Sequence, residues 1–282
     1  MKKSSRSKPK EALPTGIPEI DRLGQVPNCT IHDYVAGVSA YVRGSFNLDA
    51  GPKKAGQIRL SNALARALAN ELGKELPKLK DRLTTYEQKV AGGLRTANAD
   101  VSERHSLDGL RLAVELKPIN LAVGRAIWNR FGDIRTFAVN IHLKFPFAIV
   151  GGVLVIPIYE EVGTTAARRA AAAEEIAAEG SAEAIVEQNQ DDRIDDTISS
   201  DIAAHSRRST VHLIKRALER LVRAGGRKGE ADATHLLEAI AVVVYDPETG
   251  KIDAALPKVG SGLRWEEFIS SIATTYRARF ED

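Results

Sequence analysis

Residues 147–157 constrain the fold of this chain more than any other stretch. They read Phe-Ala-Ile-Val-Gly-Gly-Val-Leu-Val-Ile-Pro, an almost unbroken apolar run that is rich in β-branched side chains. A strand with no polar face is typical of the centre of a sheet that helices cover on both sides. The run therefore predicts a mixed α/β protein whose core is built around this strand.

The composition is that of a globular protein with its own core. The 282 residues are 43% hydrophobic, and the formal net charge is only +3, so binding to nucleic acid would need local basic patches. The single cysteine, Cys29, excludes a disulfide framework within the chain and a cysteine-based zinc site. Residues 1–18 are basic and polar, so we expect a flexible arm and not a signal peptide. No stretch is long and apolar enough to span a membrane, and we expect a cytoplasmic protein.

Helical and strand patterns alternate along the rest of the chain. The Ala- and Glu-rich stretch 160–196 is expected to form a surface helix and a mobile segment, and residues 28–50 support no assignment. Periodicity and stop signals predict helices at 57–76, 79–93, 121–129, 134–143, 201–224, 230–238 and 265–280, and strands at 110–117, 147–157 and 239–246.

Residues 100–117 are predicted to form a β-hairpin with charged residues on one face. In the second strand the even-numbered residues 110–116 are apolar, whereas the odd-numbered ones include Glu115 and Lys117. Asp108-Gly109 is a typical two-residue hairpin turn. Folding about this turn pairs Asp100 with Lys117 and Ser102 with Glu115. Asp100, Glu115 and Lys117 then lie on the same face of the sheet, within reach of one another.

Two carboxylates and a lysine at one place can hold a hard divalent cation beside a phosphate. Asp108 is nearer to Glu115 in sequence, but seven residues of strand correspond to roughly 23 Å, whereas ligand oxygens lie about 2–2.5 Å from their ion. We therefore choose Asp100 as the partner of Glu115, with Asp108 as the alternative. Taken alone, the tripeptide 115–117 also fits a solvated outer face, so this assignment depends on its setting.

The order of helix, hairpin, helix and buried strand around Asp100 and Glu115-Leu116-Lys117 resembles the PD-(D/E)XK nuclease superfamily, and within it the type II restriction endonucleases. The resemblance covers about residues 80–158, with 239–246 as a further strand. Ala99 stands where the family motif has proline. The resemblance implies an α/β (α+β) fold with a restriction-endonuclease-like core, a mixed central sheet flanked by helices, and added C-terminal helices. It also implies one nuclease domain over 19–282, which includes a C-terminal part at 197–282.

The resemblance further implies Mg²⁺-dependent hydrolysis of double-stranded DNA at a specific sequence, with one or two Mg²⁺ ions in each active site. Asp100 and Glu115 would be metal ligands, together with the backbone carbonyl of Leu116. Glu87, on the helix predicted before the hairpin, is a further candidate ligand, although an exposed helix glutamate is an equal reading. Lys117 would position the attacking water and stabilise the transition state.

Contacts to DNA phosphates would come from local basic groups, although such residues are more often the solvated face of a helix. Lys89 and Arg95 are expected to be solvated, and Asn140 fits either a base-reading role or a cap. The candidates for phosphate contacts are Arg125, Arg130, Arg207, Arg208 and Lys215.

The expected partners are DNA and a second copy of the chain, because a palindromic target calls for a two-fold symmetric homodimer. The phosphate loops and glycine fingerprints of nucleotide-binding proteins are absent from the sequence, as are the serine-hydrolase elbow and paired zinc histidines, so we expect no nucleotide cofactor. Two alternatives remain: a structure-specific repair nuclease or junction resolvase of the same fold, and a non-catalytic DNA-binding protein.

Overall fold

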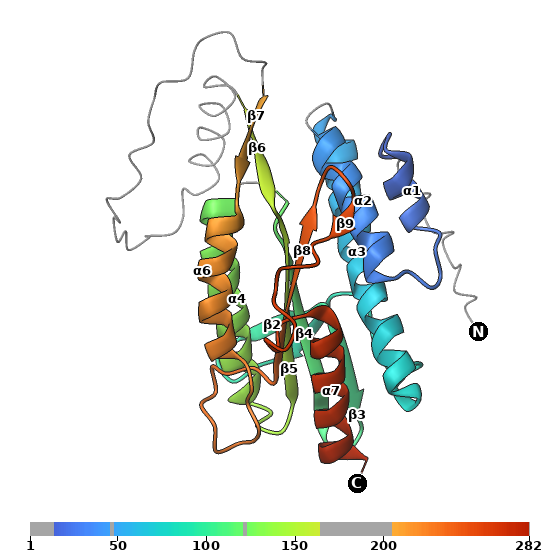
Figure 1. The fold of residues 1–282 in the computed structure, drawn as a ribbon. Helices are drawn as coiled ribbons and strands as arrows, with labels where there is room; N and C mark the ends of the chain where they lie inside the picture. The colour runs from blue at the N-terminus through green and yellow to red at the C-terminus, as the bar shows by residue number, and fades with distance from the viewer. Residues whose placement is uncertain (1–13, 46–47, 121–122, 164–204, 282) are drawn as a thin grey trace, which may run out of the picture. The chain divides into compact units, whose positions relative to one another are not determined.

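The computed structural model describes residues 14–45, 48–120, 123–163 and 205–281 (Figure 1). It divides into two compact units, Met1–Ile158 with Thr210–Asp282 and Tyr159–Ser209, where the sequence predicts a single domain over 19–282. None of the helices that the described residues form is long and apolar enough to cross a membrane.

The first unit is built on a five-stranded mixed sheet in the order β3-β4-β5-β8-β9. β4, β5 and β8 run parallel, and an antiparallel strand lies at each edge. Every residue of the central strand β5 is buried, which confirms the prediction from the apolar run. The bounds are β3 (Val101–His105), β4 (Gly109–Pro118), β5 (Ile149–Pro157), β8 (Ala239–Asp246) and β9 (Lys251–Ile252).

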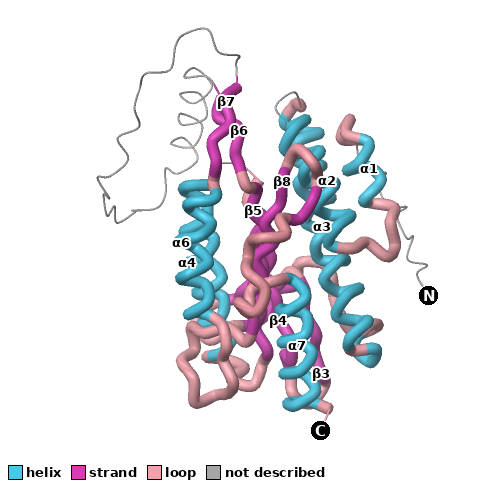
Figure 2. The backbone as a smooth tube through the Cα atoms, viewed as in Figure 1, coloured by secondary structure: helices cyan, strands magenta, loops and turns pink. Residues whose placement is uncertain are grey.

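Helices cover both faces of this sheet (Figure 2). Along β5, Val153 and Val155 face the core beneath α3 and α7, whereas Leu154 and Ile156 face the core beneath α4 and α6. This arrangement confirms the prediction of a mixed sheet flanked by helices. The bounds are α1 (Pro18–Leu23), α2 (Ile31–Gly44), α3 (Ala50–Glu75), η2 (Pro77–Leu79), α4 (Val123–His142), α6 (Val211–Leu221), η3 (Val222–Ala224) and α7 (Trp265–Phe280).

The helix predicted at 79–93 is wrong. After η2, the strands β1 (Gln88–Ala91) and β2 (Thr96–Ala99) pair as a separate antiparallel hairpin. The pair Gly92-Gly93 suits both the end of a helix and a tight turn, and here it begins the turn of this hairpin. Val90 and Ala99 are buried beneath α4, so the hairpin packs on that side of the sheet.

Other predicted helices also differ from the structure. α4 is one continuous helix where the sequence predicts two, at 121–129 and 134–143. The helix predicted at 201–224 begins only at Val211, and the stretch 230–238 forms turns instead of a helix. The pattern at 57–76 belongs to the longer helix α3, in which Ile58 is 53% exposed.

Part of the predicted flexible arm at 1–18 is packed. Thr15 and Ile17 are buried, and the Thr15 hydroxyl donates to Asp21 Oδ1 over 2.9 Å. Residues 1–13 lie outside the described residues. The stretch 28–50, for which the sequence supports no assignment, holds α2, which begins with a capping box at Thr30 and Asp33.

The second unit contains an antiparallel pair of strands, β6 (Tyr159–Gly163) and β7 (His205–Ser209). An ion pair joins Glu160 of β6 to Arg208 of β7. The surface helix and mobile segment predicted at 160–196 lie outside the described residues from 164 onward. Its first residues form a strand and not a helix.

Candidate active site

β3 and β4 form the predicted hairpin, but in a different register. His105 pairs with Gly109, so the loop spans three residues, 106–108, instead of centring on Asp108-Gly109. A β-bulge then follows, because Glu103 pairs with Leu112 and the next residue, Arg104, pairs with Leu110. Arg111 is thus the extra residue of the bulge.

The predicted pairing of Asp100 with Lys117 is therefore wrong by two residues. Ser102 pairs with Ala113, and the Asp100 amide donates to the Val114 carbonyl over 3.1 Å. Extending this register brings Asp100 opposite Glu115. A shift of two residues preserves the face, because side chains alternate with period two.

Asp100, Glu115 and Lys117 line one cavity of about 400 Å³, which we call the acidic cavity. β4 and Asp100, the residue just before β3, form its floor, and its walls come from α4 and from the β1–β2 hairpin with the segment before it. The wall residues that matter for its chemistry are Glu87, Arg95 and Asn98 from the hairpin segment and Asp133, Thr136 and Asn140 from α4.

A hydrogen bond from β4 fixes the Asp100 carboxylate in place. The Leu116 amide donates to Asp100 Oδ2 over 2.7 Å, which holds this carboxylate beside the tripeptide 115–117. Burial raises the pKa of Asp100, and the nearby charge of Glu87 acts in the same direction. The Leu116 hydrogen bond and the positive charge of Lys117 oppose this shift.

Glu115 is buried in an environment that disfavours a negative charge. It is 8% exposed, and burial raises its pKa to about 7 even though Lys117 lowers it. Lys117 Nζ lies 2.5 Å from Glu115 Oε1, whereas the buried Oε2 has no hydrogen-bond partner in the described part of the chain. The charges of Asp100 and Asp133 raise the pKa of Glu115 further. This carboxylate can accept another cation.

Glu87 lines the acidic cavity from the segment before β1, and not from a helix as predicted. It accepts a hydrogen bond from the Asn98 side chain, across the β1–β2 hairpin. A second, smaller cavity of about 280 Å³ shares Glu87 and Asp100 and is lined on its other side by residues of α3 such as Ser61 and Asn62.

The donor set of the acidic cavity fits a hard divalent cation. With all groups ionised, four acidic and two basic side chains give its lining a net charge of −2. Oxygen ligands with excess negative charge are what Mg²⁺ prefers. In this conformation no three His, Cys, Asp or Glu side chains among the described residues stand close enough to hold a metal ion. The charged residues are Glu87, Asp100, Glu115 and Asp133 against Arg95 and Lys117.

The alternative carboxylate, Asp108, lies elsewhere. It forms an ion pair with Arg111, and its Oδ2 lies 3.3 Å from His105 Nδ1, at the tip of the β3–β4 hairpin. It lines a different, more apolar cavity, together with Phe145 and Phe280. Asp108 is therefore not brought together with Glu115.

Of the predicted phosphate contacts, those in the first unit lie outside the acidic cavity. Arg125 and Arg130 are exposed on α4, where Arg130 lies 3.1 Å from Asp133, and Lys215 is exposed on α6. Arg207 and Arg208 belong to β7 of the second unit, where Arg208 pairs with Glu160.

Arg95 is exposed, as the sequence predicts, and it also lines the acidic cavity. Asn140 is also there, but it is buried and its amide binds the β1–β2 turn, so it acts neither as a cap nor as a free base-reading group. No pattern in the sequence signals either position, because both depend on the unpredicted hairpin.

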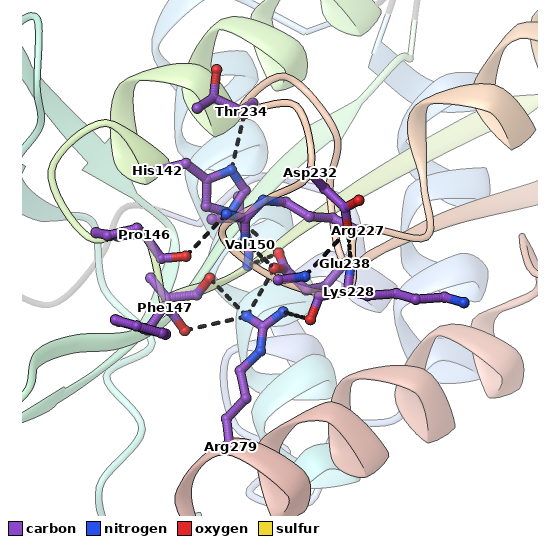
Figure 3. Close-up of polar contacts among 12 residues, drawn as sticks. His142, Pro146, Phe147, Val150, Arg227, Lys228, Asp232, Thr234, Glu238 and Arg279 are labelled. Carbon is purple, nitrogen blue, oxygen red and sulfur yellow. Dashed lines mark hydrogen bonds and ion pairs between the residues drawn. The ribbon is translucent and has the colours of Figure 1, made fainter.

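A second charged cluster surrounds the buried Glu238 (Figure 3). Glu238 Oε1 lies 2.8 Å from both Arg227 Nη1 and Arg279 Nη1, and Oε2 accepts a hydrogen bond from the Val150 amide over 2.8 Å. His142 Nε2 lies 3.3 Å from Oε2. Because both carboxylate oxygens have partners, this cluster is structural and offers no free ligand.

Comparisons of the chain with family models, with curated proteins and with solved structures found no match. A function must therefore be inferred from the geometry and chemistry of the acidic cavity.

Proposed function

We propose that this chain is a Mg²⁺-dependent nuclease that cuts double-stranded DNA at a specific sequence, as a type II restriction endonuclease does. The observation that carries the proposal is the convergence of Asp100, Glu115 and Lys117 on one cavity, where Glu115 Oε2 has no partner. The order of β3, β4, α4 and β5 also agrees with a restriction-endonuclease-like core. A palindromic target would require two copies of the chain, so we propose a homodimer.

The charge of the cavity supports dependence on a metal. A phosphodiester is an anion, and a lining with a net charge of −2 repels it. When bound, Mg²⁺ supplies the missing positive charge and lowers the pKa of a coordinated water. Asp100 and Glu115 are the residues that would hold the ion, with the Leu116 carbonyl as the third ligand that the resemblance implies.

Lys117 acts on the phosphate and on the attacking water. Its ammonium group, held beside Glu115 Oε1, can donate hydrogen bonds to a water and to a phosphate oxygen at once. A fixed positive charge that meets charge developing in the transition state typically contributes a few kcal/mol. Lys117 is therefore the residue whose removal should affect cleavage far more than binding.

The test combines plasmid DNA, Mg²⁺ and the Lys117→Ala variant. The wild-type chain should give discrete fragments that disappear with EDTA, whereas Lys117→Ala should bind DNA but lose most cleavage. Lys144→Ala removes an exposed lysine outside the acidic cavity and should cut normally. Cleavage by Lys117→Ala at the wild-type rate would refute the assignment.

The same experiment separates the alternatives. A smear, or cutting of branched DNA only, would favour a structure-specific repair nuclease or junction resolvase of the same fold. Tight binding without any cutting would favour a non-catalytic DNA-binding protein.

A further inference from the structure

Asn140 of α4 forms hydrogen bonds with the turn of the β1–β2 hairpin. Its Oδ1 accepts hydrogen bonds from the amides of Leu94 and Arg95, over 2.8 and 3.1 Å, and its Nδ2 donates to the Arg95 carbonyl over 2.8 Å. The Gly93 amide donates to the Asn140 backbone carbonyl over 2.7 Å. Asn140 is only 2% exposed, so these bonds are protected from water.

The two glycines of the turn make this close approach possible. A Cβ atom at Gly92 would lie 2.2 Å from Asn140 Nδ2, and one at Gly93 would lie 2.4 Å from the Cβ of Leu143. A side chain at Gly92 would displace the Asn140 side chain, and one at Gly93 would force α4 and the turn apart. The turn is therefore held as a rigid extension of α4 rather than as a loose loop.

The residue that this arrangement positions is Arg95. Its backbone is bound on both sides by Asn140, yet its side chain is exposed, lines the acidic cavity and has no hydrogen bond or ion pair with any described residue. The other cation of the cavity, Lys117, is already bound to Glu115. A guanidinium on a rigid backbone, free to make a bidentate contact, is suited to a phosphate.

We propose that Arg95 binds a backbone phosphate of the nucleic acid a few nucleotides from the one that is cut, so that the acidic cavity takes a polynucleotide strand rather than an isolated phosphodiester. The inference rests on the proposed function for its position relative to the cut. β2 is extended, so the five residues from Arg95 to Asp100 span about 16 Å. A nucleic acid strand advances about 3.4 Å per nucleotide, so this backbone span corresponds to about five nucleotides.

The experiment measures binding of a labelled mixed-sequence 20-base-pair duplex by fluorescence anisotropy at several salt concentrations. Lys117→Ala with Mg²⁺ serves as the background, because there the duplex should remain uncut. Adding Arg95→Gln should weaken binding roughly tenfold and lower the slope of log affinity against log salt by about one. Arg95→Lys, which keeps the charge but not the bidentate fork, should recover part of the affinity.

Lys89→Gln is the matched control, because Lys89 is exposed on the same hairpin but does not line the cavity. Its affinity should stay within about twofold of the background, since a single exposed charge has little effect at a distance. An unchanged slope in Arg95→Gln, or an equal loss in Lys89→Gln, would overturn the assignment of Arg95.

The outcomes also separate this inference from the proposed function. Binding by the wild-type chain without cleavage would refute the nuclease proposal, but the DNA affinities of Arg95→Gln and Lys89→Gln could still be compared. Normal cleavage by the wild-type chain together with normal binding by Arg95→Gln would sink only the inference. Failure of the wild-type chain to bind nucleic acid would overturn both.

Discussion

At the scale of single residues, Glu115 is an acid placed where its charge is disfavoured. Burial raises its pKa from 4.5 to about 7, so the folded chain keeps a proton on Glu115 in a pH range where the unfolded chain has lost it. The stability of the metal-free protein should therefore fall as the pH rises from about 4.5 to 7. A bound cation would remove this penalty by favouring the ionised form.

The first prediction is that binding of Mg²⁺ releases a proton near neutral pH. Because Glu115 must ionise to act as a ligand, up to one proton should be released for each bound ion at pH 6.5, and Mg²⁺ affinity should increase from pH 6 to pH 8. Isothermal titration calorimetry in buffers of different ionisation enthalpy measures both quantities. Glu115→Gln should abolish the release, and tight Mg²⁺ binding without any proton release would contradict the role of Glu115.

A second prediction concerns stability without metal. Glu115→Gln removes the buried charge at pH 8, so the free energy of unfolding in EDTA should increase. A pKa shift of this size, which already includes the opposing effect of Lys117, corresponds to a gain of at most about 3 kcal/mol. Urea unfolding at pH 8 and pH 5 measures this gain in unfolding free energy, which should be smaller at pH 5. A variant less stable than wild type at pH 8 would show that the ion pair dominates.

The grouping of Asp100, Glu115 and Lys117 could be predicted from sequence, but their pairing could not. Side chains alternate between the two faces of a strand, so an error of two residues in the pairing leaves each side chain on the predicted face. The hairpin loop is 106–108, three residues instead of the two expected, and it shifts the pairing of the two strands by three residues from the predicted register. The bulge at Arg111 shifts the pairing back by one residue, so the net shift is two residues, an even number. Nothing in the local sequence requires this bulge.

At the scale of elements, the β1–β2 hairpin is held by contacts that are remote in sequence. Val90 and Ala99 pack beneath α4, and Asn140 binds the turn from the far end of the same helix. Because each strand has only four residues and little apolar surface, the hairpin depends on α4 for its stability. The direction of Arg95 should therefore be controlled from α4.

The third prediction tests this dependence with Asn140→Ala. The variant loses three hydrogen bonds to the turn, so hydrogen exchange at residues 92–95 should accelerate, and the protein should lose about 1–3 kcal/mol of stability. DNA affinity should fall as in Arg95→Gln, although the charge of Arg95 is kept. Asn129→Ala, at an exposed position of α4, is the control. Faster exchange with unchanged DNA binding would separate the turn from the function of Arg95.

Sequence periodicity predicts the elements that are stable by their own pattern. The central strand at 147–157, the strand at 239–246 and the helix at 265–280 each carry a long apolar pattern, and all three are confirmed. β1 and β2 carry no such pattern, because their few buried residues are small or widely spaced. For the same reason, periodicity could not predict the positions of Arg95 and Asn140, which follow from packing between distant segments.

At the scale of the first unit, Glu238 links the two helical layers at the N-terminal ends of the interior strands β5 and β8. Its carboxylate binds His142 of α4, the Val150 amide of β5, Arg227 and Arg279 of α7 (Figure 3). The two arginines in turn donate to backbone carbonyls of Pro146, Phe147, Ala148 and Lys228. One carboxylate thus organises charges that come from both faces of the sheet.

The last prediction is that this cluster governs the stability of the first unit in acid. Burial acts to raise the pKa of Glu238, but His142, the Val150 amide and Arg279 outweigh it, and the net pKa is lowered. Its stabilisation is therefore present above the ordinary glutamate pKa of 4.5 and is lost as the pH falls through the lowered pKa. Glu238→Gln leaves Arg227 buried without a counter-ion, which should cost about 3–5 kcal/mol at pH 7.

Urea unfolding between pH 3 and pH 7 tests this prediction, with Glu75→Gln as the control. Glu75 is half-exposed and lies 3.8 Å from Arg277, a geometry in which an ion pair contributes little. The difference between Glu238→Gln and wild type should be largest at pH 7 and should shrink towards pH 3, because protonation neutralises the wild-type carboxylate there. A constant difference across this range would mean that the shape of Glu238, and not its charge, holds the cluster together.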